Sequence, residues 1–385
     1  MKSGLTLILF CNLFLSVSAP LFARELKVNQ AGPFTTIQQA INSAGKGDTI
    51  LVNVEGNFTE NNISISKDLV IRGLGQAVTI LQAHAERGQA SHRLFYITGG
   101  AKVTIEYLTL QHGLEKADPT PGKGNGGGIL VDGVNTSVVL NYVSVKHCDT
   151  ELPGASGGAI ALMGAGTSLS LNNCLLDNNI ANHGSGGGLY LASTGGDCFI
   201  RNTGFDNNVA ANGHGGAVYM LGQANSTFIS TSFTGNQSLN QHNGGAVFIS
   251  GSVPTFNNCL FLRNSADKEG GALKIDGADI ANCTFYFNTA TLGGAISQDA
   301  QNENRELFLS NCTLLNNAAT GFGSSGAGLH TSSAAAQVYM INTVIDKSTS
   351  GADLYLFAAS SLATNEKNHV GKASFTNGSV QFASN

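Results

Sequence analysis

The chain has 385 residues, of which 49 are glycine, none is tryptophan and only 12% are charged. A formal net charge of -5 and a pI near 6.0 exclude a basic nucleic-acid-binding surface, so we expect no nucleic-acid partner. Because the charged content is about half the usual ~25%, the surface must be built from Asn, Ser, Thr, Gly and Gln, which is typical of extracellular β-solenoids rather than cytosolic enzymes.

The first 23 residues are expected to be an export signal. Lys2 gives a positive end, residues 5–15 form an apolar stretch broken by Asn12, and small residues lead to Ala23. This order predicts a secretory signal peptide over residues 1–23, followed by a single domain over residues 24–385. No other segment approaches the ~18 apolar residues of a membrane span, so we expect no transmembrane segment in the mature chain.

Residues 24–48 are predicted to form an N-terminal cap. Thr36 and Gln39 have the spacing of a capping box, and apolar residues then recur at helical spacing from Ile37 to Ala44. A short amphipathic helix over the open end of a sheet blocks edge pairing.

One motif recurs through the predicted coils, residues 49–358. It reads Gly-Gly-Ala followed by Ile, Leu or Val, with small variations, and its copies start 23 to 33 residues apart. A period in this range indicates a solenoid, a propeller or an array, in which each repeat buries its apolar face by stacking on its neighbours. The copies begin at Gly126, Gly157, Gly186, Gly215, Gly244, Gly270, Gly293 and, in degraded form, Gly326.

A second motif runs in phase with the first. An aromatic or aliphatic anchor precedes each later glycine pair, Asn follows the anchor by three residues, and a small residue precedes it by two. The anchors and asparagines are Leu176 and Asn179, Phe205 and Asn208, Phe233 and Asn236, Phe261 and Asn264, Phe285 and Asn288, Leu314 and Asn317.

Each repeat contains short strand-like runs and no helical pattern. Residues 244–271 hold three runs, 246–250, 254–259 and 260–262, separated by turn residues. Such a repeat is one coil of a parallel β-helix, and we expect about eleven coils; leucine-rich, TPR and ankyrin repeats need other spacings or helices.

Stacked coils place equivalent residues in ladders along the axis, about 4.8 Å apart. We therefore expect an inward aliphatic ladder, an inward phenylalanine stack and an asparagine ladder at a bend. Four cysteines share one inward phase with two threonines, so we expect buried, reduced thiols rather than disulfides or a metal site. The aliphatic ladder is Val218, Val247, Leu273 and Ile296; the cysteines are Cys174, Cys259, Cys283 and Cys312.

Residues 359–385 are predicted to form a C-terminal cap. Two strand-like runs, 372–376 and 379–383, flank Asn377-Gly378, which is a hairpin signal. The hairpin would cover the second open end of the solenoid.

The chain also resembles known families. Phe34 to Ile41 with Gly47 to Ile50 looks like the opening of pectin-lyase-like right-handed β-helix proteins. The paired Gly-Gly-Ala-Ile and Phe-x-x-Asn motifs over about residues 126–330 resemble the repeats of chlamydial polymorphic outer-membrane proteins. That resemblance implies a Gram-negative surface adhesin, although no length remains past about residue 350 for the family's autotransporter barrel.

Candidate site residues are few. Lys146, Asp177 and Asp206 each follow an anchor by one residue, so they form an outward ladder in which the two carboxylates stand about 5 Å apart. This pair is a possible Ca²⁺ site, and no other cofactor is expected. His183, His214 and His242 precede glycine pairs at three different offsets, so we expect unstacked, solvated turn histidines.

The sequence favours an exported, non-catalytic binding protein, secreted or at the cell outer membrane surface. Its expected partners are a host-cell surface or a polysaccharide. The alternatives are a polysaccharide lyase or glycoside hydrolase of the pectin-lyase-like fold, and a structural spacer. A convergent charged cluster on one lateral face would favour the enzyme, and a broad face of Asn, Thr and Ser would favour binding.

Overall fold

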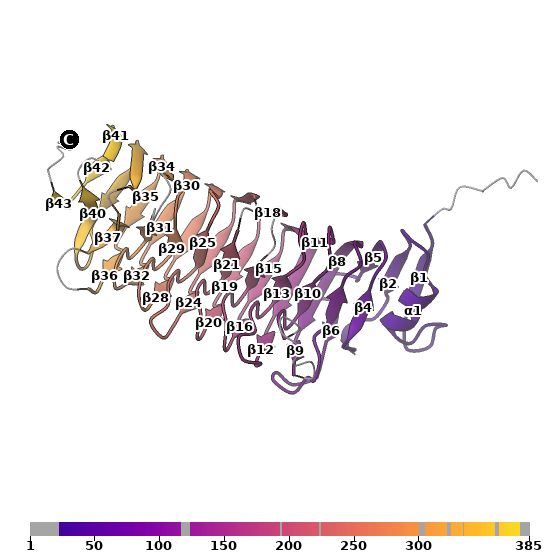
Figure 1. Cartoon of the computed structure of the whole chain (residues 1–385). Helices are drawn as coiled ribbons and strands as arrows, with labels where there is room; N and C mark the ends of the chain where they lie inside the picture. The colour runs from indigo at the N-terminus through magenta and orange to yellow at the C-terminus, as the bar shows by residue number, and fades with distance from the viewer. Residues whose placement is uncertain are drawn as a thin grey trace, which may run out of the picture.

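The computed structural model describes residues 23–116, 124–192, 195–222, 225–299, 305–321, 325–333, 335–358 and 362–377. Residues 1–22 of the predicted signal peptide and the second run of the predicted terminal hairpin lie outside these ranges. The chain forms a long solenoid whose coils stack from the end that carries β1 (Glu25–Val28) and α1 (Ile37–Ser43) to the end that carries β43 (Ala373–Asn377) (Figure 1). Neighbouring coils pair in parallel in all three sheets, which confirms the predicted parallel β-helix.

Three sheets run along the solenoid. Sheet B has twelve strands among the described residues: β4 (Ile63–Ile65), β7 (Phe95–Ile97), β10 (Ile129–Val131), β13 (Ile160–Leu162), β17 (Leu189–Leu191), β21 (Val218–Leu221), β25 (Val247–Ser250), β29 (Leu273–Ile275), β33 (Ile296–Gln298), β37 (Gly326–Thr331), β40 (Ala352–Ala358) and β43. Sheet C has eight: β9 (Leu114–Glu115), β12 (Asp149–Thr150), β16 (Ile180–Ala181), β20 (Val209–Ala210), β24 (Gln237–Ser238), β28 (Ser265–Ala266), β32 (Thr289–Ala290) and β36 (Ala318–Ala319). The predicted number of coils stays a prediction, because the end coils are irregular.

Sheet A takes up two strands in most coils. Its 23 described strands are β1, β2 (Thr49–Val52), β3 (Gly56–Thr59), β5 (Leu69–Arg72), β6 (Thr79–Gln82), β8 (Lys102–Gln111), β11 (Ser137–Lys146), β14 (Ser168–Asn172), β15 (Leu175–Asp177), β18 (Asp197–Arg201), β19 (Gly204–Asp206), β22 (Asn225–Ile229), β23 (Ser232–Thr234), β26 (Thr255–Asn257), β27 (Leu260–Leu262), β30 (Ala278–Ala281), β31 (Thr284–Tyr286), β34 (Glu306–Ser310), β35 (Thr313–Leu315), β38 (Gln337–Ile341), β39 (Val344–Asp346), β41 (Leu362–Glu366) and β42 (His369–Val370).

In most coils, a residue in the left-handed backbone conformation separates the two strands of sheet A. Asn258, with φ of 57°, separates β26 from β27, and Asn282 and Asn311 do the same in the next two coils. Asparagine tolerates this conformation because its short side chain satisfies local backbone groups. The repeated Asn therefore turns the chain without interrupting the register.

The interior consists of the predicted ladders. Phe205, Phe233, Phe261 and Phe285 are fully buried, and their rings stack with centroids 5.1, 4.8 and 4.5 Å apart. The aliphatic ladder of sheet B is buried in register, with Val218 opposite Val247 and Leu273 opposite Ile296. The cysteines that share the threonine phase are also buried, while their redox state stays a prediction.

The asparagine ladder is buried and fully bonded. The side-chain amide of Asn236 donates to Oδ1 of Asn264 at 2.9 Å and to the carbonyl of Phe205 at 2.8 Å, and Oδ1 of Asn264 also accepts the backbone N–H of Asn236 at 3.0 Å. The same set of bonds joins Asn179 to Asn208 and Asn264 to Asn288. This ladder closes the corner between sheets A and C.

The two glycines of the motif have separate roles. Gly215 has φ of +66°, a conformation that residues with a Cβ rarely adopt. A Cβ on Gly216 would collide with the carbonyl oxygens of Gly245 and Gln237 on the next coil. The first glycine thus turns the chain, and the second lets successive coils approach.

Three details depart from or refine the sequence prediction. A repeat has four strands rather than three, because residues such as Ser265–Ala266 form the narrow sheet C. The first run of the predicted hairpin is β43, which pairs in parallel with β40, and the predicted C-terminal cap stays a prediction. Helix α1 forms where predicted, with the hydroxyl of Thr36 accepting the N–H of Gln39, and its capping role stays a prediction.

Within the described ranges no helix is both long and apolar enough to span a bilayer.

Candidate functional site

The predicted carboxylate ladder forms on sheet A. Asp177 lies opposite Asp206 and Lys146 lies opposite Asp177, so the three residues occupy one outward position on successive coils. Burial raises the pKa of Asp206, and the nearby charge of Asp177 raises it further. Among the described residues no group of three or more His, Cys, Asp or Glu side chains is placed to hold a metal ion. The Ca²⁺ site therefore stays a prediction that rests on two carboxylates.

An arginine beside this ladder has a structural role. Arg87, from the segment between β6 and β7, forms two hydrogen bonds with the carboxylate of Asp149, at 2.9 and 2.6 Å. Its Nη2 also donates to the carbonyl of Asn178 at 2.9 Å. The Arg87 side chain therefore connects the segment between β6 and β7 to the two successive coils that carry Asp149 and Asn178. The repeat pattern does not predict this contact, because Arg87 lies outside the repeats.

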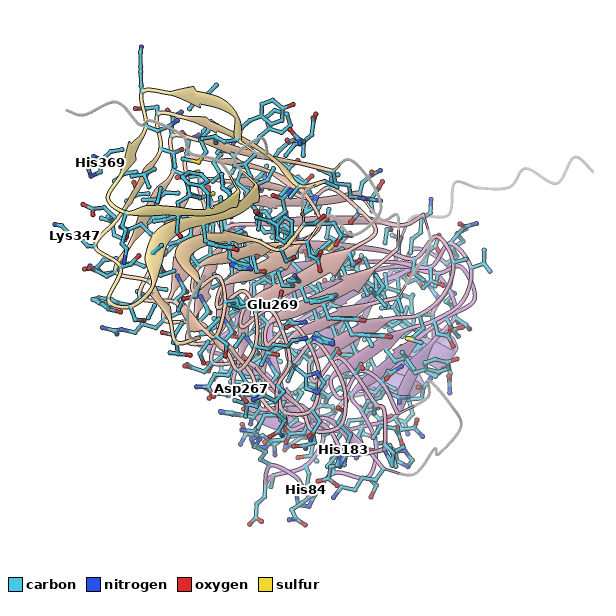
Figure 2. All side chains as sticks on the ribbon, turned by 60° about the vertical axis from the view of Figure 1, so that its left-hand side comes forward. His84, His183, Asp267, Glu269, Lys347 and His369 are labelled. Carbon is cyan, nitrogen blue, oxygen red and sulfur yellow. The ribbon has the colours of Figure 1, made fainter. Side chains whose placement is uncertain are left out.

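The prediction of an unstacked, solvated turn histidine is wrong for His214, which is half-buried against Tyr219 and Phe248. The rings of His214 and His242 meet edge to face with centroids 4.7 Å apart. The turn before Gly244 contains an extra residue, so Asn243 takes the position equivalent to His214 and His242 moves beside it; Nδ1 of His214 accepts the N–H of Asn243. His183 is exposed and lies well apart from Glu269 in Figure 2.

A second outward column, on sheet B, was not identified from the sequence. It starts with a stack of aromatic side chains: the rings of Tyr190 and Tyr219 are 5.4 Å apart and parallel, and those of Tyr219 and Phe248 are 5.2 Å apart. All three side chains are half-buried. The column continues through polar residues in strict register. We call it the sheet B ladder: Tyr190, Tyr219, Phe248, Lys274, Ser297, His330 and Tyr355.

A parallel column borders the aromatic part of the sheet B ladder. His214 lies against Phe248, with ring centroids 4.7 Å apart, and against Tyr219, at 6.2 Å. Burial lowers the pKa of His214 to about 4, and the positive charges of His242, Lys268 and Lys274 act in the same direction. His214 is therefore neutral at physiological pH and extends the aromatic surface sideways.

Lys274 is the centre of a charged network. It is only 7% exposed, and its ammonium contacts Oε2 of Glu269 at 2.6 Å and Oδ2 of Asp299 at 3.6 Å. The hydroxyl of Ser297 bonds Glu269 at 3.1 Å and lies 3.4 Å from the same ammonium. Burial raises the pKa of Glu269, but Lys274 and Ser297 outweigh that effect and lower it, so the carboxylate is ionised.

His330, which precedes Tyr355 in the column, has an unsatisfied ring nitrogen. The residue is 5% exposed, its ring stacks on Tyr355 at 4.9 Å, and its Nδ1 is buried with no hydrogen-bond partner. Burial lowers the pKa of His330 to about 4. A neutral imidazole can donate or accept a proton in a hydrogen bond, depending on its tautomer.

The sheet B ladder thus combines an apolar aromatic stretch with a fixed polar cluster on consecutive coils. The aromatic stretch is half-buried and can contact a ligand, whereas Lys274, Ser297 and His330 are 7%, 0% and 5% exposed. A signal for it exists in the sequence: each member except Tyr355 stands three residues after the second residue of a copy of the motif. It was missed because the residue type changes along the column while a repeat search looks for what stays constant.

Comparisons with known proteins identify the fold. No protein-family model matches the chain, and no curated protein matches its sequence. The catalytic domain of a GH87 α-1,3-glucanase in complex with nigerose aligns with 94% of this chain and 69% of its own, at 13% identity and a TM-score of 0.50. An aspartate-to-alanine variant described in the same way gives the same values. The A-module of the mannuronan C-5 epimerase AlgE4 of Azotobacter vinelandii aligns with 90% of this chain and 93% of its own, at 11% identity and a TM-score of 0.46. At this identity, the glucanase likeness establishes a shared architecture, a parallel β-helix with pectin-lyase-like topology.

Proposed function

We propose that this protein binds a polysaccharide chain along the outer face of sheet B. The observation that carries the proposal is the stacked row of Tyr190, Tyr219 and Phe248 on consecutive coils. Its centroid spacing of 5.4 and 5.2 Å approximates the length of one sugar ring, so successive rings of a polymer can meet equivalent positions.

The chemistry of the row suits a saccharide. Stacked aromatic rings with centroids 5.4 and 5.2 Å apart form a continuous apolar row against which the C–H groups of a sugar can pack. Tyrosine adds a hydroxyl that bonds sugar hydroxyls, and its ring loses little conformational entropy on binding. Glu269 is half-buried beside the next coil of the same face, and its carboxylate is held by the hydroxyl of Ser297 at 3.1 Å.

The structural neighbours support a polysaccharide more than a host-cell surface. The α-1,3-glucanase domains are described in complex with nigerose, a saccharide, on the same architecture. The adhesin interpretation rests on the resemblance to chlamydial repeats and remains compatible with export and with saccharide binding. We therefore retain export and narrow the partner to a polysaccharide.

A binding panel tests the proposal. The purified mature protein is titrated with soluble neutral glucans, amino-sugar polymers and polyuronates, and binding is measured by calorimetry. A Tyr219→Ala, Phe248→Ala double variant is expected to lose at least ~10-fold in affinity, because truncated anchor residues commonly cost more than ~1.4 kcal/mol. Phe308→Ala is the matched control, since Phe308 is a 39% exposed sheet A residue whose ring stacks on Tyr339 at 4.4 Å. Equal affinity of the double variant and the wild type would rule out this surface.

Polysaccharide cleavage is the second candidate function. It is favoured by the charged network around Lys274, which is the convergent cluster that the enzyme hypothesis requires. The same panel, assayed for new reducing ends and for unsaturated ends, separates the two functions. Ends released by the wild type and lost in Asp299→Asn would establish catalysis; saturable binding without new ends would leave a binding protein.

A further inference from the structure

Three half-buried aromatic side chains form an open stretch in the middle of the outward column of sheet B. They are Tyr190, Tyr219 and Phe248, on three successive coils. On the coil before Tyr190 the outward residue is Ala161, which is completely buried, and on the coil after Phe248 it is Lys274, which is 7% exposed. A ligand can therefore reach the column at the three rings but not at the positions on either side of them.

A side-chain contact closes the column before Tyr190. Asn125 directly precedes the glycine motif of its coil, and its Nδ2 donates to Sδ of Met163 at 3.1 Å. Met163 directly follows β13, so the contact joins the two edges of sheet B. The outward residues of these two coils, Leu130 and Ala161, are completely buried. The row of accessible rings therefore does not continue in this direction.

The charged network of Lys274 closes the column beyond Phe248. Glu269 directly precedes a glycine pair, and Asp299 directly follows β33. Both carboxylates contact the ammonium of Lys274, at 2.6 and 3.6 Å, so these side chains also join the two edges of the sheet. Ser297, the next member of the sheet B ladder, is completely buried. The row of accessible rings therefore ends at Phe248.

The length of the open stretch limits how many sugar units the column can contact. Neighbouring ring centroids are 5.4 and 5.2 Å apart, close to the length of one sugar unit, so three rings match at most three units. A fourth unit would lie over the Asn125 contact or over the Lys274 network, where the outward residues of the column are buried. Because binding energy is concentrated in the residues that a partner contacts, a fourth unit adds little affinity.

We propose that the open stretch recognises a run of two or three sugar units, and that a longer chain passes beyond it without further contact with the column. The inference rests on the proposed polysaccharide binding and adds the length of the segment that is recognised. The affinity is then set by three rings rather than by the length of the solenoid, so a soluble trisaccharide competes with the polymer for each site.

Oligosaccharides of two to six units test this inference by calorimetry. Three series are titrated: neutral gluco-oligosaccharides, chito-oligosaccharides and oligouronates. In a series that binds, the affinity should reach its maximum at two or three units and stay within ~2-fold of that value up to six units. The comparison is corrected for the number of registers in which a longer chain can occupy the site. An affinity that rises beyond this margin from three to six units would overturn the inference.

Two tyrosine variants separate the open stretch from the rest of the column. Tyr190→Ala removes one of the three rings and should lower the affinity for a hexasaccharide ~10-fold, as truncation of an anchor residue commonly does. Tyr96→Ala is the matched control, because Tyr96 is half-buried on the same column but lies beyond the buried Leu130 and Ala161. The control should leave the hexasaccharide affinity unchanged, whereas a chain that followed the whole column would lose affinity in both variants. Phe248→Ala shortens the row from its other end and repeats the test if thermal melting shows that Tyr190→Ala folds poorly.

The outcomes separate this inference from the proposed function. A loss of affinity in Tyr96→Ala, or binding of polymers without binding of any oligosaccharide up to six units, overturns the length limit. The effect of Tyr219→Ala with Phe248→Ala would still support the aromatic row in that case. Failure of the wild type to bind any polysaccharide overturns both.

Discussion

Replacing one buried asparagine tests how much the ladder between sheets A and C contributes to stability. In Asn264→Ala, four side-chain hydrogen bonds disappear: Oδ1 loses the backbone N–H and the amide of Asn236, and Nδ2 loses the carbonyl of Phe233 and Oδ1 of Asn288. Asn236 is completely buried, so its N–H is left without its partner. At a net ~1 kcal/mol for each bond, with a further ~1 kcal/mol for the orphaned donor, we expect a loss of about 4–5 kcal/mol.

Urea unfolding followed by far-ultraviolet circular dichroism measures this change. Asn225→Ala is the control, because Asn225 is exposed and makes one amide-to-carboxylate bond of 3.1 Å to Asp197. The control should change the free energy of unfolding by less than ~0.5 kcal/mol, as is usual for surface substitutions. A loss below ~1 kcal/mol in Asn264→Ala, at an unchanged m-value, would refute the claim that the amide ladder stabilises the corner.

Further predictions concern the core, the thiols and the carboxylate pair. Phe261→Ala should cost ~3–5 kcal/mol in urea unfolding, since its ring is fully buried between two others; thermal stability equal to that of the wild type would contradict the column. Cys312, whose pKa burial raises to about 11, should resist alkylation until denaturant is added, and mass spectrometry of the native protein would reveal any disulfide. Because the folded-state pKa of Asp206 is raised, its ionisation costs stability as the pH rises above the ordinary carboxyl range; Asp206→Asn should therefore melt higher than the wild type at pH 7, with the difference vanishing in acid. If Asp177 and Asp206 bind Ca²⁺, millimolar calcium should raise the melting temperature of the wild type but not of Asp206→Asn, and no calcium effect would remove the site.

The interior could be predicted because equivalent inward positions have the same packing environment in successive coils. Each coil must present the same shape to its neighbours, so residues equivalent to Phe233 and Asn236 recur in successive coils. From this recurrence the sequence predicts both the ladders and that their side chains point inward. The narrow sheet C was missed because two-residue strands such as Val209–Ala210 carry no periodicity of their own.

The outward face could not be predicted in the same way. The outward positions do not keep one residue type along the column, since Phe248 is followed by Lys274 and then by Ser297. The contact between His214 and His242 depends on the length of a turn, so counting positions along the repeat does not predict it. The constant spacing between the glycine motif and the members of the sheet B ladder was the remaining signal. It shows which residues belong to the column but not what their function is.

The asparagine ladder gives the solenoid a direction. Every side-chain amide from Asn179 to Asn288 donates to the Oδ1 of the following coil, and Oδ1 of Asn179 accepts from the N–H of Cys148 behind it. The amide dipoles therefore point the same way and polarise one another along the axis. As a result the two ends of the molecule are chemically different, and a coil added to the ladder continues it only head to tail.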